Sequence, residues 1–148
     1  MFEASAIKPS QLSSFDVIIY GGGLYAGGIG GVKLVTKNQC KSLIVFTVGL
    51  ADPATTDYSP ILSKNFTQDM LSKTKLFHLR GGMDYKRLNL IHKGMMALMR
   101  KETQKKDPSK LNEEDRLFLE TYGKVLDFMD KTSIQPILDH MNTLGESE

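Results

Sequence analysis

The chain has 148 residues, of which 41% are hydrophobic and 24% are charged, and its formal net charge is +2. These fractions exclude a disordered or collagen-like chain, and the length predicts a single domain over residues 1–148. Cys40 is the one cysteine, which excludes a disulfide framework and is typical of a reducing cytoplasm, and neither a signal peptide nor a membrane-spanning apolar run is visible.

Three short apolar runs predict parallel strands in the first half of the chain. They cover residues 16–20, 42–48 and 75–79, and glycine follows each of them closely. Continuous apolar runs of this length are typical of strands buried on both faces. Helices are expected between them, at residues 28–37 and 60–73. This alternation predicts an α/β fold with right-handed crossovers.

The second half of the chain is predicted to be helical. Apolar residues spaced three and four apart indicate an amphipathic helix from residue 85 to about residue 105. Asn112 is a typical helix cap, and the helix after it is expected to reach about residue 129. A last helix is expected over residues 133–141.

The first of these helices is strongly basic. Residues 86–106 contain seven basic side chains and one acid, Glu102, which is a local charge of +6. A basic amphipathic helix can face a membrane surface or an acidic partner. The alternative is a solvated helix in which Leu98 and the methionines 95, 96 and 99 fill gaps in the core.

Glycine loops follow the first two predicted strands. Seven of the 13 glycines lie within residues 21–31, and a second loop begins around Gly49. Ligands of open α/β sheets bind beyond the carboxyl ends of the strands. Glycine there lets backbone amides approach a flat ring or an anion closely. The two loops together predict one binding crevice, and the alternative is that both are tight turns that only fit helix against strand.

Other kinds of site are disfavoured. Residues 21–26 match the dinucleotide fingerprint G-x-G-x-x-A, but the acid it needs at the end of the next strand is absent, since the first acid beyond that strand is Asp52. The three histidines are too widely spaced for a metal site, and no catalytic side chain is predicted. A nucleic-acid partner has little support, because the basic charge is confined to one helix without interleaved aromatic residues.

Three motifs in order carry a family resemblance over Phe2 to Ile137. DVIIYGGGLYAGGIGGVKLV, LIVFTVGLADP and FHLRGGMDYKRLNLIHKGMM resemble flavodoxin-domain proteins related to the bacterial flavodoxin-like, quinone-dependent protoporphyrinogen oxidase. The resemblance implies a flavodoxin-like three-layer α/β/α fold with a five-stranded parallel sheet ordered 2-1-3-4-5, which binds FMN without a covalent bond.

The resemblance also implies which residues hold the flavin ring. The two ring-binding loops of the family correspond here to Gly21, Gly22, Gly23, Leu24, Tyr25, Ala26, Thr47, Val48, Gly49 and Leu50. Tyr25 is the candidate for stacking on the isoalloxazine ring. Leu24 is the candidate for apolar contact with its dimethylbenzene edge.

The sequence departs from the family at its start. Family members open with a buried strand, a Ser/Thr/Gly-rich loop around the FMN phosphate, and a helix, whereas this chain begins at the second strand, Phe2–Ile7. If Met1 is the true start, FMN binding is weak or absent. Residues 16–20 then form an unpaired apolar edge, so we expect a homo-oligomer built on that edge. The alternative is that the sequence is truncated.

The sequence therefore favours an FMN-binding flavodoxin-like protein in redox or electron transfer. An FMN-dependent oxidase of the protoporphyrinogen type is its enzymatic version and an electron carrier its non-catalytic one, with a redox protein or quinone as partner. The alternative is a cofactor-free, truncated fold that acts by oligomerisation without catalysis. The expected location is cytoplasmic, and a location at a membrane surface, held there by the basic helix, is the alternative.

Overall fold

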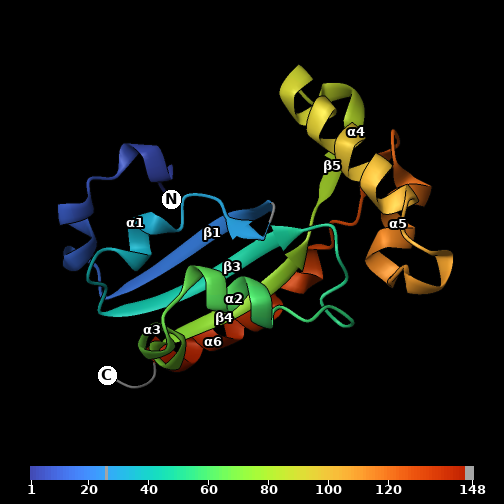
Figure 1. The fold of residues 1–148 in the computed structure, drawn as a ribbon. Helices are drawn as coiled ribbons and strands as arrows, with labels where there is room; N and C mark the ends of the chain where they lie inside the picture. Colours follow the sequence, from blue (N-terminus) through green and yellow to red (C-terminus); the bar gives the residue numbers. More distant parts are fainter. Residues whose placement is uncertain (26, 146–148) are drawn as a thin grey trace. The chain divides into compact units, whose positions relative to one another are not determined.

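The computed structural model describes residues 1–25 and 27–145 and divides the chain into two compact units (Figure 1). Unit 1 comprises Met1–Arg80 together with Asp130–Glu148, and unit 2 comprises Gly81–Met129. Each unit has its own small sheet and its own helices. The single-domain organisation over residues 1–148 stays a prediction.

Unit 1 is built on a mostly parallel sheet in which the strands lie in the order β2-β1-β3-β4. The strands are β1 (Val17–Tyr25), β2 (Gly28–Ile29), β3 (Ser42–Gly49) and β4 (Thr74–Arg80). β1, β3 and β4 are parallel, whereas β2 folds back antiparallel onto the end of β1. The three apolar runs thus form the predicted parallel strands, which confirms the mixed α/β class. The described residues of this unit form four strands rather than the five implied by the resemblance.

Three short helices cover one face of this sheet: α1 (Lys33–Thr36), α2 (Ser59–Asn65) and α3 (Gln68–Lys73). They pack on alternate strand residues, among them Tyr20, Leu43 and Val45, none of which is more than 8% exposed. This layer holds the hydrophobic core of the unit, because period-two alternation places those side chains on the same face.

Helix α6 (Gln135–Gly145) follows the 3₁₀ helix η5 (Lys131–Ile134) and runs alongside β4 on the other face (Figure 1). The rings of Phe77 on β4 and His140 on α6 have centroids 6.1 Å apart, and Ile44 in the central strand is fully buried. Val17 and Ile19 of β1 remain 37% and 38% exposed. The fold is therefore the expected three-layer arrangement, with an apolar margin left open at β1.

The N-terminal segment differs from the prediction. Residues 2–7 are not a strand; the segment forms the 3₁₀ helices η1 (Ala4–Ala6) and η2 (Pro9–Ser14). No strand in the described part of the chain pairs with it. Without a neighbour to accept its ladder hydrogen bonds, an isolated extended segment has nothing to stabilise it.

The helices between the strands are also shorter than predicted. The helix expected at 28–37 shrinks to α1, because Gly28–Ile29 pair with β1 and Gly31 adopts a left-handed φ of 68°. The helix expected at 60–73 is divided into α2 and α3 by Phe66, whose backbone is extended. Pairing and backbone conformation therefore override the helical spacing of the apolar residues.

Unit 2 consists of two main helices and a two-stranded antiparallel sheet. Its elements are β5 (Gly82–Asp84), η3 (Tyr85–Arg87), α4 (Leu90–Gln104), η4 (Pro108–Lys110), α5 (Glu113–Thr121) and β6 (Val125–Asp127). The helix predicted to reach residue 129 ends at Thr121. Gly123, with a φ of 82°, turns the chain so that β6 pairs with β5 instead.

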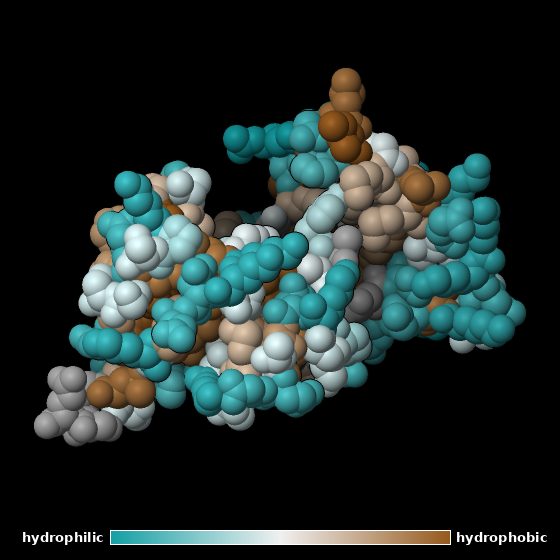
Figure 2. Space-filling model, turned by 60° about the vertical axis from the view of Figure 1, so that its left-hand side comes forward, coloured by the Kyte–Doolittle hydropathy of each residue, from teal (hydrophilic) through white to brown (hydrophobic). Residues whose placement is uncertain are grey.

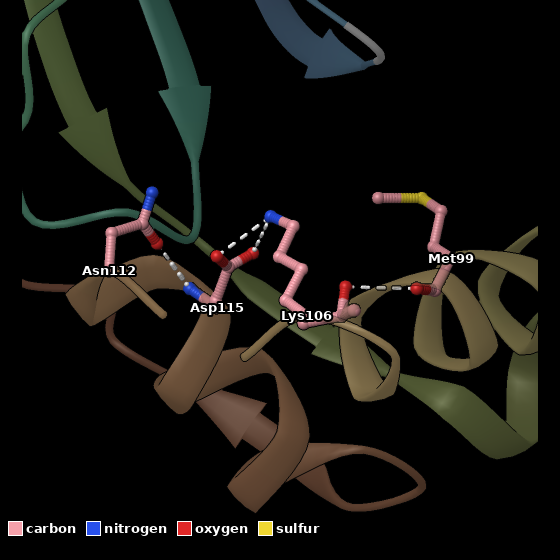
Figure 3. Close-up of polar contacts among 5 residues, drawn as sticks. Met99, Lys106, Asn112 and Asp115 are labelled. Atoms are coloured by element: carbon pink, nitrogen blue, oxygen red, sulfur yellow. Dashed lines mark hydrogen bonds and ion pairs between the residues drawn. The ribbon is translucent and has the colours of Figure 1, made fainter. Parts of the chain in front are cut away.

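Side-chain contacts fix the turn between α4 and α5 (Figure 3). Asn112 accepts a hydrogen bond from the backbone N–H of Asp115 at 2.7 Å, which caps α5 as the sequence predicts. The carboxylate of Asp115 also pairs with Lys106 Nζ at 2.8 Å. One turn earlier, Thr103 Oγ1 donates to the carbonyl oxygen of Met99 at 2.9 Å.

Helix α4 exposes apolar side chains. Ile91, Leu98 and Met99 are 74%, 62% and 52% exposed, and brown residues project at the top of Figure 2, at the height of α4 in Figure 1. Met95 is 40% exposed as well, so the interpretation that these side chains fill gaps in the core is wrong for Met95, Leu98 and Met99. No helix in the described part of the chain is long and apolar enough to cross a membrane. A membrane-surface or acidic partner for this helix, and a cytoplasmic location, stay predictions.

Candidate functional site

The glycine cluster forms the end of a strand and a hairpin, not the loop that the sequence predicts. Residues 21–23 continue β1 and lie in register with residues 46–48 of β3. Gly27, with a φ of 72°, then turns the chain back as β2. The ladder to β3 carries β1 through the glycines as far as Gly23, and pairing with β2 adds Leu24 and Tyr25, although glycine by itself has little tendency to form a strand.

Close packing explains two of these glycines. A Cβ atom at Gly22 would lie 2.6 Å from Cγ2 of Ile29 and 2.9 Å from the carbonyl oxygen of Gly30. A Cβ atom at Gly21 would overlap the ring of Phe46. At these positions glycine lets β2 and the Phe46 ring approach β1, so here the packing interpretation of the cluster is sufficient.

Gly23 has no such packing role. An added Cβ atom there would meet nothing within 4 Å, and Gly23 is not among the described residues with a positive φ. Its register partner on β3 is Val48, so the two residues share a face. Gly23 therefore leaves an open space at the carboxyl ends of two adjacent parallel strands, which is where ligands of α/β sheets bind.

Two other predicted site residues, Leu24 and Tyr25, follow Gly23 along β1. Cδ1 of Leu24 lies 3.2 Å from the place of a Cβ atom on Gly49, so Leu24 rests against Gly49 and the core. Tyr25 is 49% exposed at the start of the hairpin turn. Ala26 lies outside the described residues. The edge thus combines a flat glycine surface with an exposed aromatic ring.

Thr47 belongs to a buried polar cluster instead. Its Oγ1 lies 2.6 Å from Nδ1 of His78, and the His78 ring stacks on that of Tyr58 at a centroid separation of 3.5 Å and an interplanar angle of 3°. Thr47 is fully buried and Tyr58 is 7% exposed. Burial lowers the pKa of His78, which favours its neutral form. The Thr47 side chain is therefore committed to the core, and only its backbone could touch a ligand.

Arg80, at the end of β4, fixes the loop that follows β3. Its Nε and Nη2 both donate to the carbonyl oxygen of Leu50, at 3.2 and 3.1 Å, and Nη1 lies 3.7 Å from the carboxylate of Asp52. Asp52 accepts in turn from the backbone N–H of Ala54 at 2.9 Å. The predicted contact residue Leu50 is thereby held next to the end of the sheet.

Asn65, the last residue of α2, holds the hairpin between β1 and β2 by hydrogen bonds. This residue was not identified from the sequence. Its Oδ1 accepts from the backbone N–H of Ile29 at 3.2 Å, and its Nδ2 donates to the carbonyl oxygens of Gly27 and Ile61 at 3.2 and 2.7 Å. One amide thus joins α2 to both sides of the turn. No local pattern marks it, because its partners lie more than 30 residues away along the chain, apart from Ile61.

Replacing Asn65 with leucine should loosen the hairpin. The change removes three hydrogen bonds and leaves half-buried backbone groups without their partner, so we expect unfolding to become easier by about 2 kcal/mol in urea titrations. Amide exchange at Ile29 should accelerate. The matched control is Asn38→Leu, which removes a single bond to the Leu34 carbonyl oxygen. Equal exchange at Ile29 in both variants would contradict the assigned role.

The comparisons with known proteins agree with this architecture. The flavodoxin domain family model matches residues 1–110, which is more than half of the chain. The chain therefore belongs to the flavodoxin domain family, and this membership indicates a flavin-binding redox role at the level of the family. Searches of curated proteins and of solved structures found no match.

The described residues fit one half of FMN better than the other. The open position at Gly23 suits a flat ring. A phosphate needs backbone amides or cations that are free to bind it. In the loop after β3, two backbone amides already donate to carboxylates. The amide of Ala54 donates to Asp52 and that of Ser59 donates to Asp57, each at 2.9 Å. Hydrogen bonds from Ser59 hold the pKa of Asp57 below its usual value, so this loop presents negative charge to any phosphate.

Proposed function

We propose that this protein binds a flavin by its isoalloxazine ring and takes part in electron transfer. The observation that carries the proposal is the open position at Gly23, beside Val48 and close to the exposed ring of Tyr25 along the chain. A bound flavin would supply one- and two-electron redox chemistry. The chain would hold the ring against the flat end of β1 and β3.

The proposal assigns a role to each of the predicted contact residues. Gly23 and Val48 would face the ring, and Tyr25 is the candidate for stacking on it. Leu24 and Gly49, which pack against each other, would support the ring from the core side. Of the remaining predicted residues, those at 21, 22 and 47 would contribute backbone only, since close packing or burial occupies their side-chain positions.

Two redox roles are compatible with this site. An oxidase of the protoporphyrinogen type would pass electrons from a porphyrinogen to a quinone, and an electron carrier would exchange electrons with a redox protein without turnover of a small substrate. Oxidation of a porphyrinogen with a quinone as acceptor distinguishes the two.

Flavin titration tests the proposal directly. Both riboflavin and FMN should lose fluorescence on binding. Because the loop after β3 offers a phosphate negative charge rather than free amides, the two dissociation constants should agree to within about tenfold, or about 1.4 kcal/mol. Unchanged fluorescence of both flavins would contradict the proposal and favour the cofactor-free alternative, in which the fold acts by oligomerisation.

The variant Gly23→Val separates binding from stability. Its side chain would occupy the open space, so we expect both dissociation constants to rise at least tenfold, about 1.4 kcal/mol, while the fold keeps its stability. Gly94→Ala is the matched control, since an added Cβ atom there also meets nothing within 4 Å but the residue lies on α4 in unit 2. Wild-type flavin affinity in Gly23→Val would place the ring elsewhere.

A further inference from the structure

Strand β1 has an open edge. It pairs with β3 from Val17 to Gly23, whereas on its other side β2 pairs only with the last two residues of the strand. The next contact on that side is the hydrogen bond from Gly30 N to the carbonyl oxygen of Gly23, 2.9 Å. In the part of the chain that the structure describes, no strand pairs with residues 17–22 at this edge.

Alternate peptide groups face this edge. Successive residues of a strand direct their N–H and C=O groups to opposite sides. The carbonyl oxygen of Gly23 points towards Gly30 on the open side. By the same alternation, the peptide groups of Gly21, Ile19 and Val17 point to the open side and are available to another strand.

The edge is apolar and uncharged. Val17 and Ile19 are more than a third exposed, and no charged residue occurs from position 17 to position 32. A groove of about 300 Å³ runs beside the edge and is lined by residues 17–21 and by apolar residues of the N-terminal segment, Phe2 among them. Natural proteins avoid leaving a long apolar edge exposed, because it pairs readily with another chain.

We propose that this edge pairs with the same edge of a second copy of the chain, antiparallel and around a two-fold axis at Ile19. In this register Ile19 faces Ile19 of the second copy, and Val17 faces Gly21 of the second copy. All three residues direct their peptide groups to the open edge, so each can exchange hydrogen bonds with its opposite residue. A self-complementary interface of this kind closes as a dimer.

The surroundings disfavour two neighbouring registers. A shift of two residues towards the carboxyl end of β1 would bring Val17 opposite Gly23, where Gly30 already occupies the edge. A shift of one residue would oppose peptide groups that face β3 and would turn the side chains to the wrong face. In the proposed register Val17 lies above Gly21 of the second copy, where the Phe46 ring supplies an apolar surface. No like charges are brought together, since the paired residues are uncharged.

The N-terminal segment leaves room for a second copy. Residues 1–6 are exposed, and the backbone hydrogen bond found within them, from Ala6 N to the carbonyl oxygen of Glu3, is local. The segment is anchored further along, at the buried Leu12. Residues 1–7 can therefore move from the groove without breaking a backbone hydrogen bond to another described element.

Charge substitutions at the axis test the proposal. Wild-type protein should be dimeric by light scattering, whereas Ile19→Lys and Ile19→Glu should each be monomeric, because like charges would face each other. An equal mixture of the two variants should recover a dimer of mixed composition. Val125→Lys is the control, since Val125 is 64% exposed on β6 and should leave the dimer intact. A wild-type monomer at every concentration would overturn the proposal, even if another peptide binds the groove.

Disulfide formation checks the register if the charged variants fold poorly. Opposite residues of a hydrogen-bonded antiparallel pair have Cα atoms about 5.5 Å apart, within the range of a disulfide. Ile19→Cys should therefore give a covalent dimer on mild oxidation. Val17→Cys, which would face Gly21, should not, and wild-type protein with its half-buried Cys40 gives the background. A covalent dimer from Val17→Cys alone would contradict the two-fold axis at Ile19.

Discussion

Replacing Gly22 with alanine is expected to lower the free energy of unfolding by about 1–3 kcal/mol. The added Cβ atom would lie 2.6 Å from Cγ2 of Ile29 and 2.9 Å from the carbonyl oxygen of Gly30. The side chain of Ile29 can rotate, but the carbonyl oxygen belongs to the backbone, so the hairpin itself must move. Urea or thermal unfolding of the purified variant measures the loss.

The neighbouring glycine provides the control. Gly23→Ala adds the same methyl group to the same strand, where it meets nothing within 4 Å. We expect it to keep or raise the unfolding free energy, by up to about 1 kcal/mol, because alanine restricts the unfolded chain more than glycine does. Equal destabilisation of both variants would mean that the hairpin does not pack across β1 as described. The pair thus separates glycine required by packing from glycine that leaves a space.

Replacing Thr47 with valine is expected to cost about 1–3 kcal/mol of stability. The side chain keeps its shape, but Nδ1 of His78 loses its 2.6 Å partner within a region where Thr47 is fully buried. The double variant Thr47→Val, His78→Phe removes both polar atoms together and should be less destabilised than the sum of the two single variants. Additive losses would show that the two side chains do not interact.

The same cluster gives stability a defined pH dependence. Burial lowers the pKa of His78 in the folded chain, so between the folded and unfolded pKa values the unfolded chain binds more protons. The contribution of neutral His78 to the free energy of unfolding is therefore fully present above about pH 6.5, the pKa of an unperturbed histidine. This contribution is lost as the pH falls below that value. His78→Phe should flatten this part of the curve of unfolding free energy against pH. If the slope were the same in His78→Phe as in the wild type, His78 would be exposed to water in the folded chain.

The glycine cluster shows why a motif and its role can be separated. Adjacent glycines at 21, 22 and 23 look equivalent in the sequence, yet two of them meet Phe46 or the returning chain and the third meets open space. That difference depends on residues that lie 7 to 25 positions away along the chain. The ring-binding interpretation therefore narrows from a loop to one position on a strand, with Val48 and Tyr25 around it.

The apolar runs were sufficient to locate the three parallel strands, because a strand buried on both faces must be apolar along its length. The same reasoning ended the first strand at Tyr20, since glycine interrupts the run, whereas pairing with β3 extends the strand to Gly23 and pairing with β2 extends it to Tyr25. The spacing of apolar residues also predicted one helix from Asn112 to about residue 129. In the structure the helix ends at Thr121, and a turn at Gly123 lets residues 125–127 pair with β5 as a strand.

The sequence by itself determined the α/β class and the order of the parallel strands along the chain, and it predicts the carboxyl ends of β1 and β3 as the place for a ligand. These follow from local composition and from rules of chain connection that hold for any such sheet. Only the tertiary structure decided that Gly23 is open while Gly22 is packed, that Asn65 holds the hairpin, and that Thr47 bonds His78. Each of these features is a contact, or the lack of one, between residues that are far apart in the sequence. Such contacts are decided by tertiary packing and not by the spacing of residues along the chain.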